Sequence, residues 1–132
     1  MKYYMFQPRF APLIKLGSKC TTIRPFRKYT PKPGETVSLR MWRGKPYRSE
    51  QVEIKQVIIN EVNTVHIGLN YFRVFSRITG NFISSPFFTS TEELDAFARK
   101  DGFCNWDNLI KWFDDNHYQG SMFEGQRIEW EI

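Results

Sequence analysis

The stretch Gly17-Ser18-Lys19-Cys20-Thr21-Thr22-Ile23-Arg24 contains the sharpest change in local sequence pattern in this chain. An apolar segment with helical spacing, residues 10–14, leads into it. Gly17 offers the positive φ angle that commonly ends a helix. The residues that follow are rich in β-branched side chains, which favour a strand. We therefore expect a short helix, a turn at Gly17 and a strand over residues 21–24.

Alternate side chains of a strand point to opposite faces, and this rule sorts the residues of the stretch. Thr22 and Arg24 should share one face, and Thr21 and Ile23 the other. Lys19 precedes the strand, so its side chain can fold over toward Thr22. The pattern thus predicts a hydroxyl, an amine and a guanidinium at one helix-to-strand corner, a place where rigid elements often present reactive groups.

A threonine hydroxyl becomes a nucleophile only when a base lies beside it. Lys19 can act as that base if its pKa falls from the usual value of about 10.4. Burial lowers a lysine pKa, and so do nearby cations, for which Lys15 and Arg24 are the local candidates. The alternative is that Lys19 and Arg24 are solvated and Thr22 is an ordinary strand residue, and spacing alone leaves both open.

The pattern Gly-x-Lys-x-x-Thr-Ile-Arg over residues 17–24 resembles the signature of ASCH domains, which are small PUA-like β-barrels. Some small bacterial ASCH proteins are amidohydrolases that remove the acetyl group from N4-acetylcytidine. The resemblance implies catalytic roles for Lys19 and Thr22. Other ASCH domains are thought to bind RNA without chemistry, so a non-catalytic RNA-binding module is the alternative. A protein-interaction domain that uses exposed aromatics is a third possibility.

A second part of the resemblance lies at Asp101-Gly102-Phe103, which precedes a helix rich in Trp and Phe. Asp101 falls where the amidohydrolases carry a catalytic glutamate, so the resemblance implies a third catalytic residue here. The aspartate departs from the family pattern because its side chain is shorter and reaches less far. Without the resemblance, Asp101 is simply a turn residue before a glycine.

Candidate substrate-binding residues lie in two places. Arg24 could bind substrate or stabilise an oxyanion. A predicted hairpin tip interleaves cations with aromatics, which suits phosphate contacts and base stacking. Its residues are Trp42, Arg43, Lys45, Tyr47 and Arg48. A charged hairpin tip with a structural aromatic is the alternative.

The composition bounds the class of protein and its partners. The 132 residues are enough for one domain over positions 1–132, and the net charge of +5 favours an anionic partner such as RNA. The resemblance implies RNA or a modified nucleoside, an acylated cytidine, as the partner. We see no signal peptide or membrane span, so we expect a cytoplasmic protein with reduced cysteines. The cysteines and histidines are scattered, so we expect no metal and no cofactor. These residues are Cys20, Cys104, His66 and His117.

The expected order of elements is strand, helix, several strands, two helices and a final strand, which favours an α+β fold with a curled, mostly antiparallel sheet. The resemblance implies that this sheet closes into a PUA-like barrel. The strands are expected at residues 3–7, 21–24, 36–42, 52–62, 71–78 and 126–132, and the helices at 9–16, from 90 to 100 and from 105. A change of apolar phase near Gln56 predicts a bulge or bend in the long strand.

Side-chain patterns refine three of these elements. Ser90 followed by Glu93 is a capping-box signature. In the last strand, Ile128, Trp130 and Ile132 should share an apolar face. The helix that begins near residue 105 should bury one stripe. The stripe comprises Trp106, Leu109, Ile110, Phe113 and His117.

Overall fold

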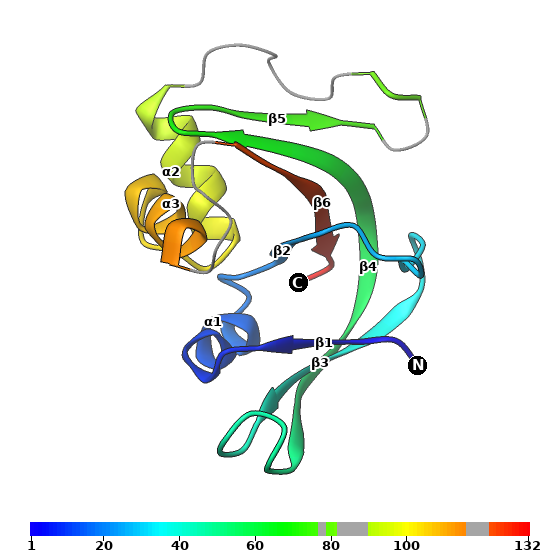
Figure 1. Cartoon of the computed structure of the whole chain (residues 1–132). Helices are drawn as coiled ribbons and strands as arrows, with labels where there is room; N and C mark the ends of the chain where they lie inside the picture. The colour runs from blue at the N-terminus through cyan, green and yellow to red at the C-terminus, as the bar shows by residue number, and fades with distance from the viewer. Residues whose placement is uncertain (77–78, 82–89, 116–121) are drawn as a thin grey trace.

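The computed structural model describes residues 1–76, 79–81, 90–115 and 122–132. Within them, a six-stranded sheet is accompanied by three short α-helices and one 3-10 turn (Figure 1), so the expected α+β class is confirmed. The elements are β1 (Tyr3–Phe6), η1 (Pro8–Phe10), α1 (Ala11–Leu16), β2 (Thr21–Arg24), β3 (Thr36–Trp42), β4 (Gln51–Gly68), β5 (Phe72–Phe75), α2 (Thr91–Lys100), α3 (Trp106–Asp115) and β6 (Met122–Trp130).

Strand β4 is the central strand of the sheet and pairs with β3, β6 and β5. The strand order is β1-β3-β4-β6-β2, and β5 pairs with the far end of β4. Among the strand pairs of the described residues, only β1–β3 is parallel, so the expectation of a mostly antiparallel sheet is confirmed. Figure 1 shows β4 curving through the molecule, with β1 and β3 at its first half, β6 and β5 at its second half, and the helices gathered on one side.

Two irregularities bend β4. The register with β3 shifts between Leu39 and Arg40, opposite residues 53–55. The register with β6 shifts between Ile59 and Glu61. An extra residue in one strand increases local twist and curvature. The irregularity that the sequence predicts near Gln56 is therefore present as two register shifts that flank that position.

The sheet is open, so a closed barrel is not seen. In the described part of the chain, β1 pairs only with β3 and β2 only with β6, which leaves a seam between the two edge strands. Pro8 and Pro25 follow soon after these short strands, and proline cannot donate to a ladder. The Arg24 side chain crosses the seam, because its Nη2 donates to the Met5 carbonyl at 2.6 Å.

The helices follow their sequence signals. The Ser90 hydroxyl accepts from the Glu93 N–H at 3.2 Å, and the complete capping box predicted for α2 is confirmed. The stripe of α3 is buried as expected at Trp106, Leu109, Ile110 and Phe113. His117 lies outside the described residues. No helix in the described ranges is long and apolar enough to cross a membrane.

Two strand predictions are corrected or cut short. Ile128 and Trp130 are buried, but Ile132 is 82% exposed, so its predicted place on the apolar face is wrong. The reason is that β6 ends at Trp130, and alternation does not extend past the end of a strand. The strand predicted over 71–78 is β5, which spans Phe72–Phe75, and residues 77–78 lie outside the described part.

A first prediction concerns Gly102, just after α2. Gly102 and Gly34 both have positive φ angles, of 95° and 87°. A Cβ atom added at Gly102 would lie 2.9 Å from atoms of both Lys19 and Phe10. A Cβ atom added at Gly34 would meet no atom within 4 Å. Gly34→Ala should lower the free energy of unfolding by about 1–2 kcal/mol, the strain of a left-handed residue. Gly102→Ala should lower it by about 1–3 kcal/mol more, the overpacking cost. Urea denaturation of both variants measures this, and equal losses would contradict the close packing at Gly102.

Candidate active site

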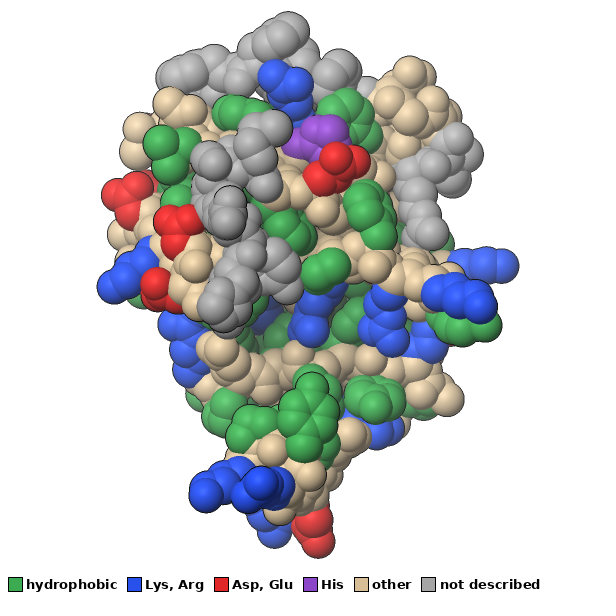
Figure 2. Space-filling model, viewed as in Figure 1, with side chains coloured by type: hydrophobic (Ala, Val, Ile, Leu, Met, Phe, Trp, Pro, Cys, Tyr) green, Lys and Arg blue, Asp and Glu red, His purple; other side chains and the backbone are tan. Residues whose placement is uncertain are grey.

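A pocket of about 170 Å³ opens at the seam between β1 and β2. Figure 2 shows a hollow across the middle of this face, with Lys and Arg side chains gathered along it. The pocket is lined by Met5, Phe6, Gln7, Phe10, Lys19, Thr22, Ile23, Arg24, Pro25, Asp101, Phe103 and Trp112. Four residues singled out in the sequence, Lys19, Thr22, Arg24 and Asp101, thus lie on its wall. Its volume is below the roughly 300–1,000 Å³ of typical small-molecule pockets, so it suits a single ring or acyl group.

The backbone around Lys19 is fixed by the ends of two helices. Helix α1 ends at Gly17 with the left-handed φ of 86° predicted from the sequence. The Lys19 N–H then donates to the Leu13 carbonyl at 3.1 Å, and the Cys20 N–H donates to the Lys100 carbonyl at 2.9 Å. Residues 19–20 are therefore held between the C-terminal ends of α1 and α2. This placement buries the Lys19 side chain, of which 3% is exposed.

The Lys19 amine is surrounded by acceptors. Its Nζ donates to the Thr21 carbonyl at 2.7 Å and to the Asp101 carbonyl. The Asp101 carboxylate oxygen Oδ1 lies 3.6 Å from Nζ, and the rings of Phe6 and Phe10 lie 5.4 and 4.9 Å away. A neutral primary amine has two N–H groups and one lone pair. The two carbonyls can take both N–H groups, which leaves the lone pair to accept a proton.

Burial sets the protonation of this site. Removal from water lowers the pKa of Lys19 to about 8, the Asp101 carboxylate opposes this change, and the nearby Arg24 cation adds to it. Burial also raises the pKa of Asp101, against the effects of the Lys19 charge and of a hydrogen bond from Thr21. The Lys19 amine is therefore substantially neutral near pH 8, a condition that a general base requires.

The Thr22 hydroxyl is held by Arg24. The Arg24 Nε donates to Thr22 Oγ1 at 2.9 Å, which confirms that these two residues share one face of β2. The guanidinium lies over the rings of Tyr4 and Phe6, at 5.3 and 4.7 Å. Because Oγ1 accepts from Arg24, the hydroxyl proton remains available for donation. A fixed cation at this oxygen also favours negative charge on it.

Thr21 is a site residue that the sequence did not reveal. It is fully buried, and its Oγ1 donates to Asp101 Oδ1 at 3.1 Å. Strand alternation places Thr21 opposite Thr22, so the sequence indicated that it faces away from the site. The α2 end packs against β2 through Asp101, and this contact between distant segments was not encoded locally. Trp112 also lines the pocket, and the sequence analysis did not select it. It lies outside the buried stripe of α3, and a tryptophan in that position is the sequence feature that could have indicated a site residue.

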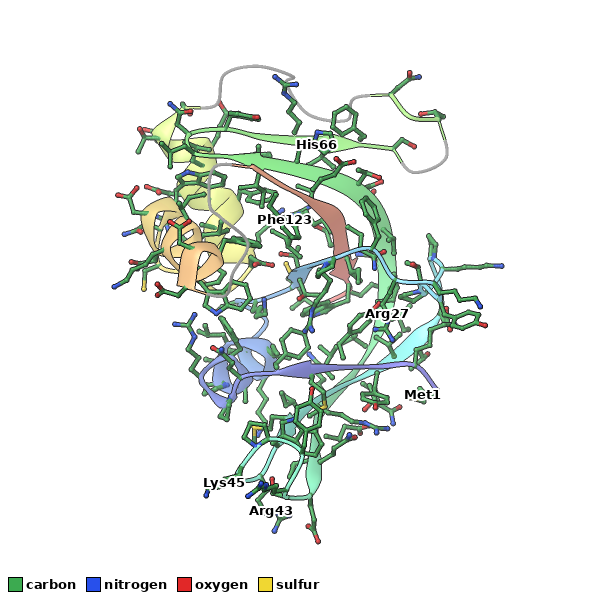
Figure 3. The ribbon with its side chains drawn as sticks, viewed as in Figure 1. Met1, Arg27, Arg43, Lys45, His66 and Phe123 are labelled. Atoms are coloured by element: carbon green, nitrogen blue, oxygen red, sulfur yellow. The ribbon has the colours of Figure 1, made fainter. Side chains whose placement is uncertain are left out.

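The predicted hairpin lies apart from the pocket. Figure 3 shows Arg43 and Lys45 at the tip of the β3–β4 hairpin, which projects past β1. The rings of Trp42 and Tyr47 pack together at 5.2 Å between centroids, and Arg43 lies 3.7 Å from the Glu50 carboxylate. None of the five predicted hairpin residues, Arg48 included, lines the seam pocket. The structure therefore does not bring this group together with Lys19.

Grouped metal ligands and similar proteins are two further features that could indicate what the pocket does. Among the described residues, no three His, Cys, Asp or Glu side chains are grouped so that they could hold a metal ion, and Cys20 and Cys104 are free thiols. Comparisons with protein families, with curated proteins and with solved structures found no match to this chain. What the pocket does is therefore inferred from its own residues.

A second prediction follows from the charges around Lys19. Asp101→Asn should lower the Lys19 pKa further below about 8, because the carboxylate raises it. Arg24→Gln should raise that pKa, because the guanidinium lowers it. Titration of the Lys19 side-chain resonances by NMR measures both shifts, with backbone amide spectra as the control for folding. Shifts of the same sign in the two variants would contradict the electrostatic account.

Proposed function

We propose that this chain is an ASCH-type, PUA-like domain that binds a nucleoside or RNA and hydrolyses the acyl amide of an N4-acetylcytidine-like substrate. One observation carries the proposal. Lys19, Thr22 and Asp101 share one small pocket, although Asp101 lies 82 positions after Lys19, and the pKa of Lys19 is lowered to about 8. A hydroxyl and a partly neutral amine in the same pocket are the two groups that nucleophilic catalysis needs.

The reaction would proceed in two halves. The neutral Lys19 amine takes the Thr22 proton as Thr22 Oγ1 attacks the acyl carbonyl carbon. The C–N bond of the amide then breaks, and Lys19 returns the proton to the leaving N4 amine. Lys19 then takes a proton from water as the water oxygen attacks the carbonyl carbon of the threonine ester. The bond between that carbon and Thr22 Oγ1 breaks, Lys19 gives the proton to Oγ1, and the carboxylic acid is released. The rate should rise with pH as Lys19 loses its proton.

Arg24 and Asp101 would assist without forming covalent bonds. Arg24 lies at Thr22 Oγ1, so its charge would stabilise the oxygen as the proton leaves. Asp101 would hold the Lys19 amine through its carbonyl and keep the site charge balanced through its carboxylate. Since the carboxylate is already hydrogen-bonded to Thr21, we assign it a positioning role.

A non-catalytic RNA-binding module is the second candidate, and one observation favours it. Lys19 donates to the Asp101 carbonyl at the C-terminal end of α2, a contact that stabilises a helix end whether or not chemistry occurs. In that case the pocket would hold an unpaired base, and the cations of the hairpin would contact phosphates along a longer strand.

The third prediction separates the two candidates. Incubation with N4-acetylcytidine should yield cytidine, and Thr22→Ala and Lys19→Met should each reduce turnover by at least about a thousandfold, as expected for residues that act as a unit. The double variant should be little worse than either single variant. Conversion is followed by chromatography of the nucleosides.

Thr36→Ala is the matched control, because Thr36 is an exposed threonine at the start of β3. It should retain full activity. Full activity of Thr22→Ala would remove the proposed nucleophile, and an inactive wild-type protein that binds single-stranded RNA would favour the non-catalytic module.

A further inference from the structure

A second recess adjoins the seam pocket. It has a volume of about 350 Å³ and shares two wall residues, Phe103 and Trp112, with the pocket. Its other walls come from η1, from α3 and from the segment between α2 and α3, which lie on the same side of the molecule (Figure 1). They are Arg9, Gly102, Cys104, Asn108, Lys111 and Asp115. A ligand that places a ring in the pocket would therefore reach this recess across the edge of Phe103 and Trp112.

Arg9 stands at the border between the two cavities. Its guanidinium lies 4.5 Å from the ring centroid of Phe10 and 5.4 Å from that of Phe103, and both rings line the seam pocket. These cation–π contacts hold the guanidinium near the ring faces, and Arg9 is itself exposed, so its N–H donors are accessible to a ligand. Within the described residues, Arg9 forms neither an ion pair nor a hydrogen bond through its side chain.

The recess carries a net positive charge. Lys111 contributes a second cation from α3, and it too lacks an ion pair to any residue of the described part. Asn108 adds a side-chain amide donor. Asp115 is the one carboxylate on the described wall, so two cations face one anion. Arg and Lys donors around an open recess are the groups that bind phosphate.

We propose that this recess is a phosphate subsite, and that the ligand of the seam pocket carries a phosphate. The phosphate would belong either to a free mononucleotide or to the backbone of a strand, and the binding chemistry is the same for both. The inference rests on the proposed function for the ring that occupies the pocket. It adds that a nucleotide, rather than a nucleoside, is the preferred ligand.

The test compares ligands that differ only in phosphate. Binding of cytidine, of its 5′- and 3′-monophosphates and of a short oligocytidylate is measured by calorimetry with the full chain. At least one monophosphate should bind about tenfold more tightly than cytidine, the gain from one charge-assisted hydrogen bond. If the oligocytidylate binds more tightly than the monophosphates, the phosphate belongs to the backbone of a strand. If the oligocytidylate and the monophosphates bind equally, it belongs to a free mononucleotide. Equal affinity for cytidine and both monophosphates, or no binding of any probe, would overturn the proposal.

Charge variants locate the effect. Arg9→Gln combined with Lys111→Gln should abolish the preference for phosphate and leave cytidine affinity unchanged. Lys15→Gln combined with Arg99→Gln is the matched control, because it removes one lysine and one arginine that are exposed and line neither cavity. Asp115→Asn should strengthen monophosphate binding a few-fold. A loss in the control as large as that in the Arg9/Lys111 pair would assign the effect to net charge and overturn the subsite.

Failure of this proposal and failure of the proposed hydrolase are distinguishable. If the protein hydrolyses N4-acetylcytidine but binds monophosphate and nucleoside with equal affinity, the phosphate subsite is excluded and the hydrolase proposal stands. If the protein prefers the monophosphate, this preference depends on Arg9 and Lys111, and no cytidine is released from N4-acetylcytidine, the subsite stands and the hydrolase proposal is excluded.

Discussion

The buried amine of Lys19 is the constraint on which the site and much of the fold depend. An ionised group taken out of water is costly unless hydrogen bonds and opposite charge compensate it. Here the compensation comes from the carbonyls of Thr21 and Asp101 and from the Asp101 carboxylate. These groups belong to β2 and to the end of α2, so satisfying one amine requires a strand and a helix to meet at one point. The incomplete compensation is what lowers the pKa of Lys19.

The open seam between β1 and β2 leaves a pocket beside the Lys19 side chain in which a ligand can bind. If β1 and β2 paired directly, backbone hydrogen bonds and side chains would fill the space that the pocket now occupies. Prolines end both strands early, and Arg24 takes the place of a strand pairing with one side-chain hydrogen bond to Met5. The same guanidinium holds the Thr22 oxygen. Arg24 therefore both bridges the two edge strands and orients the Thr22 hydroxyl.

Local signals predicted the elements well, and contacts between distant segments explain what they could not predict. The turn at Gly17, the β2 strand and the capping box at Ser90 depend on a few adjacent residues, and each was found. The role of Thr21 depends on α2 docking some 80 positions later in the chain, and the position of the hairpin depends on how far β3 and β4 extend. Ile132 was misplaced because alternation gives no sign of where a strand ends. The family resemblance and the catalytic roles remain predictions.

The most direct test of the central claim is to look for the acyl group on the protein. Wild-type protein is mixed briefly with N4-acetylcytidine, quenched in acid, digested and analysed by mass spectrometry. The account predicts an acetyl ester on Thr22 that is absent from Lys19→Met, because the hydroxyl then has no base. Release of cytidine with no acetyl group on Thr22, or with the acetyl group trapped on another residue, would contradict it.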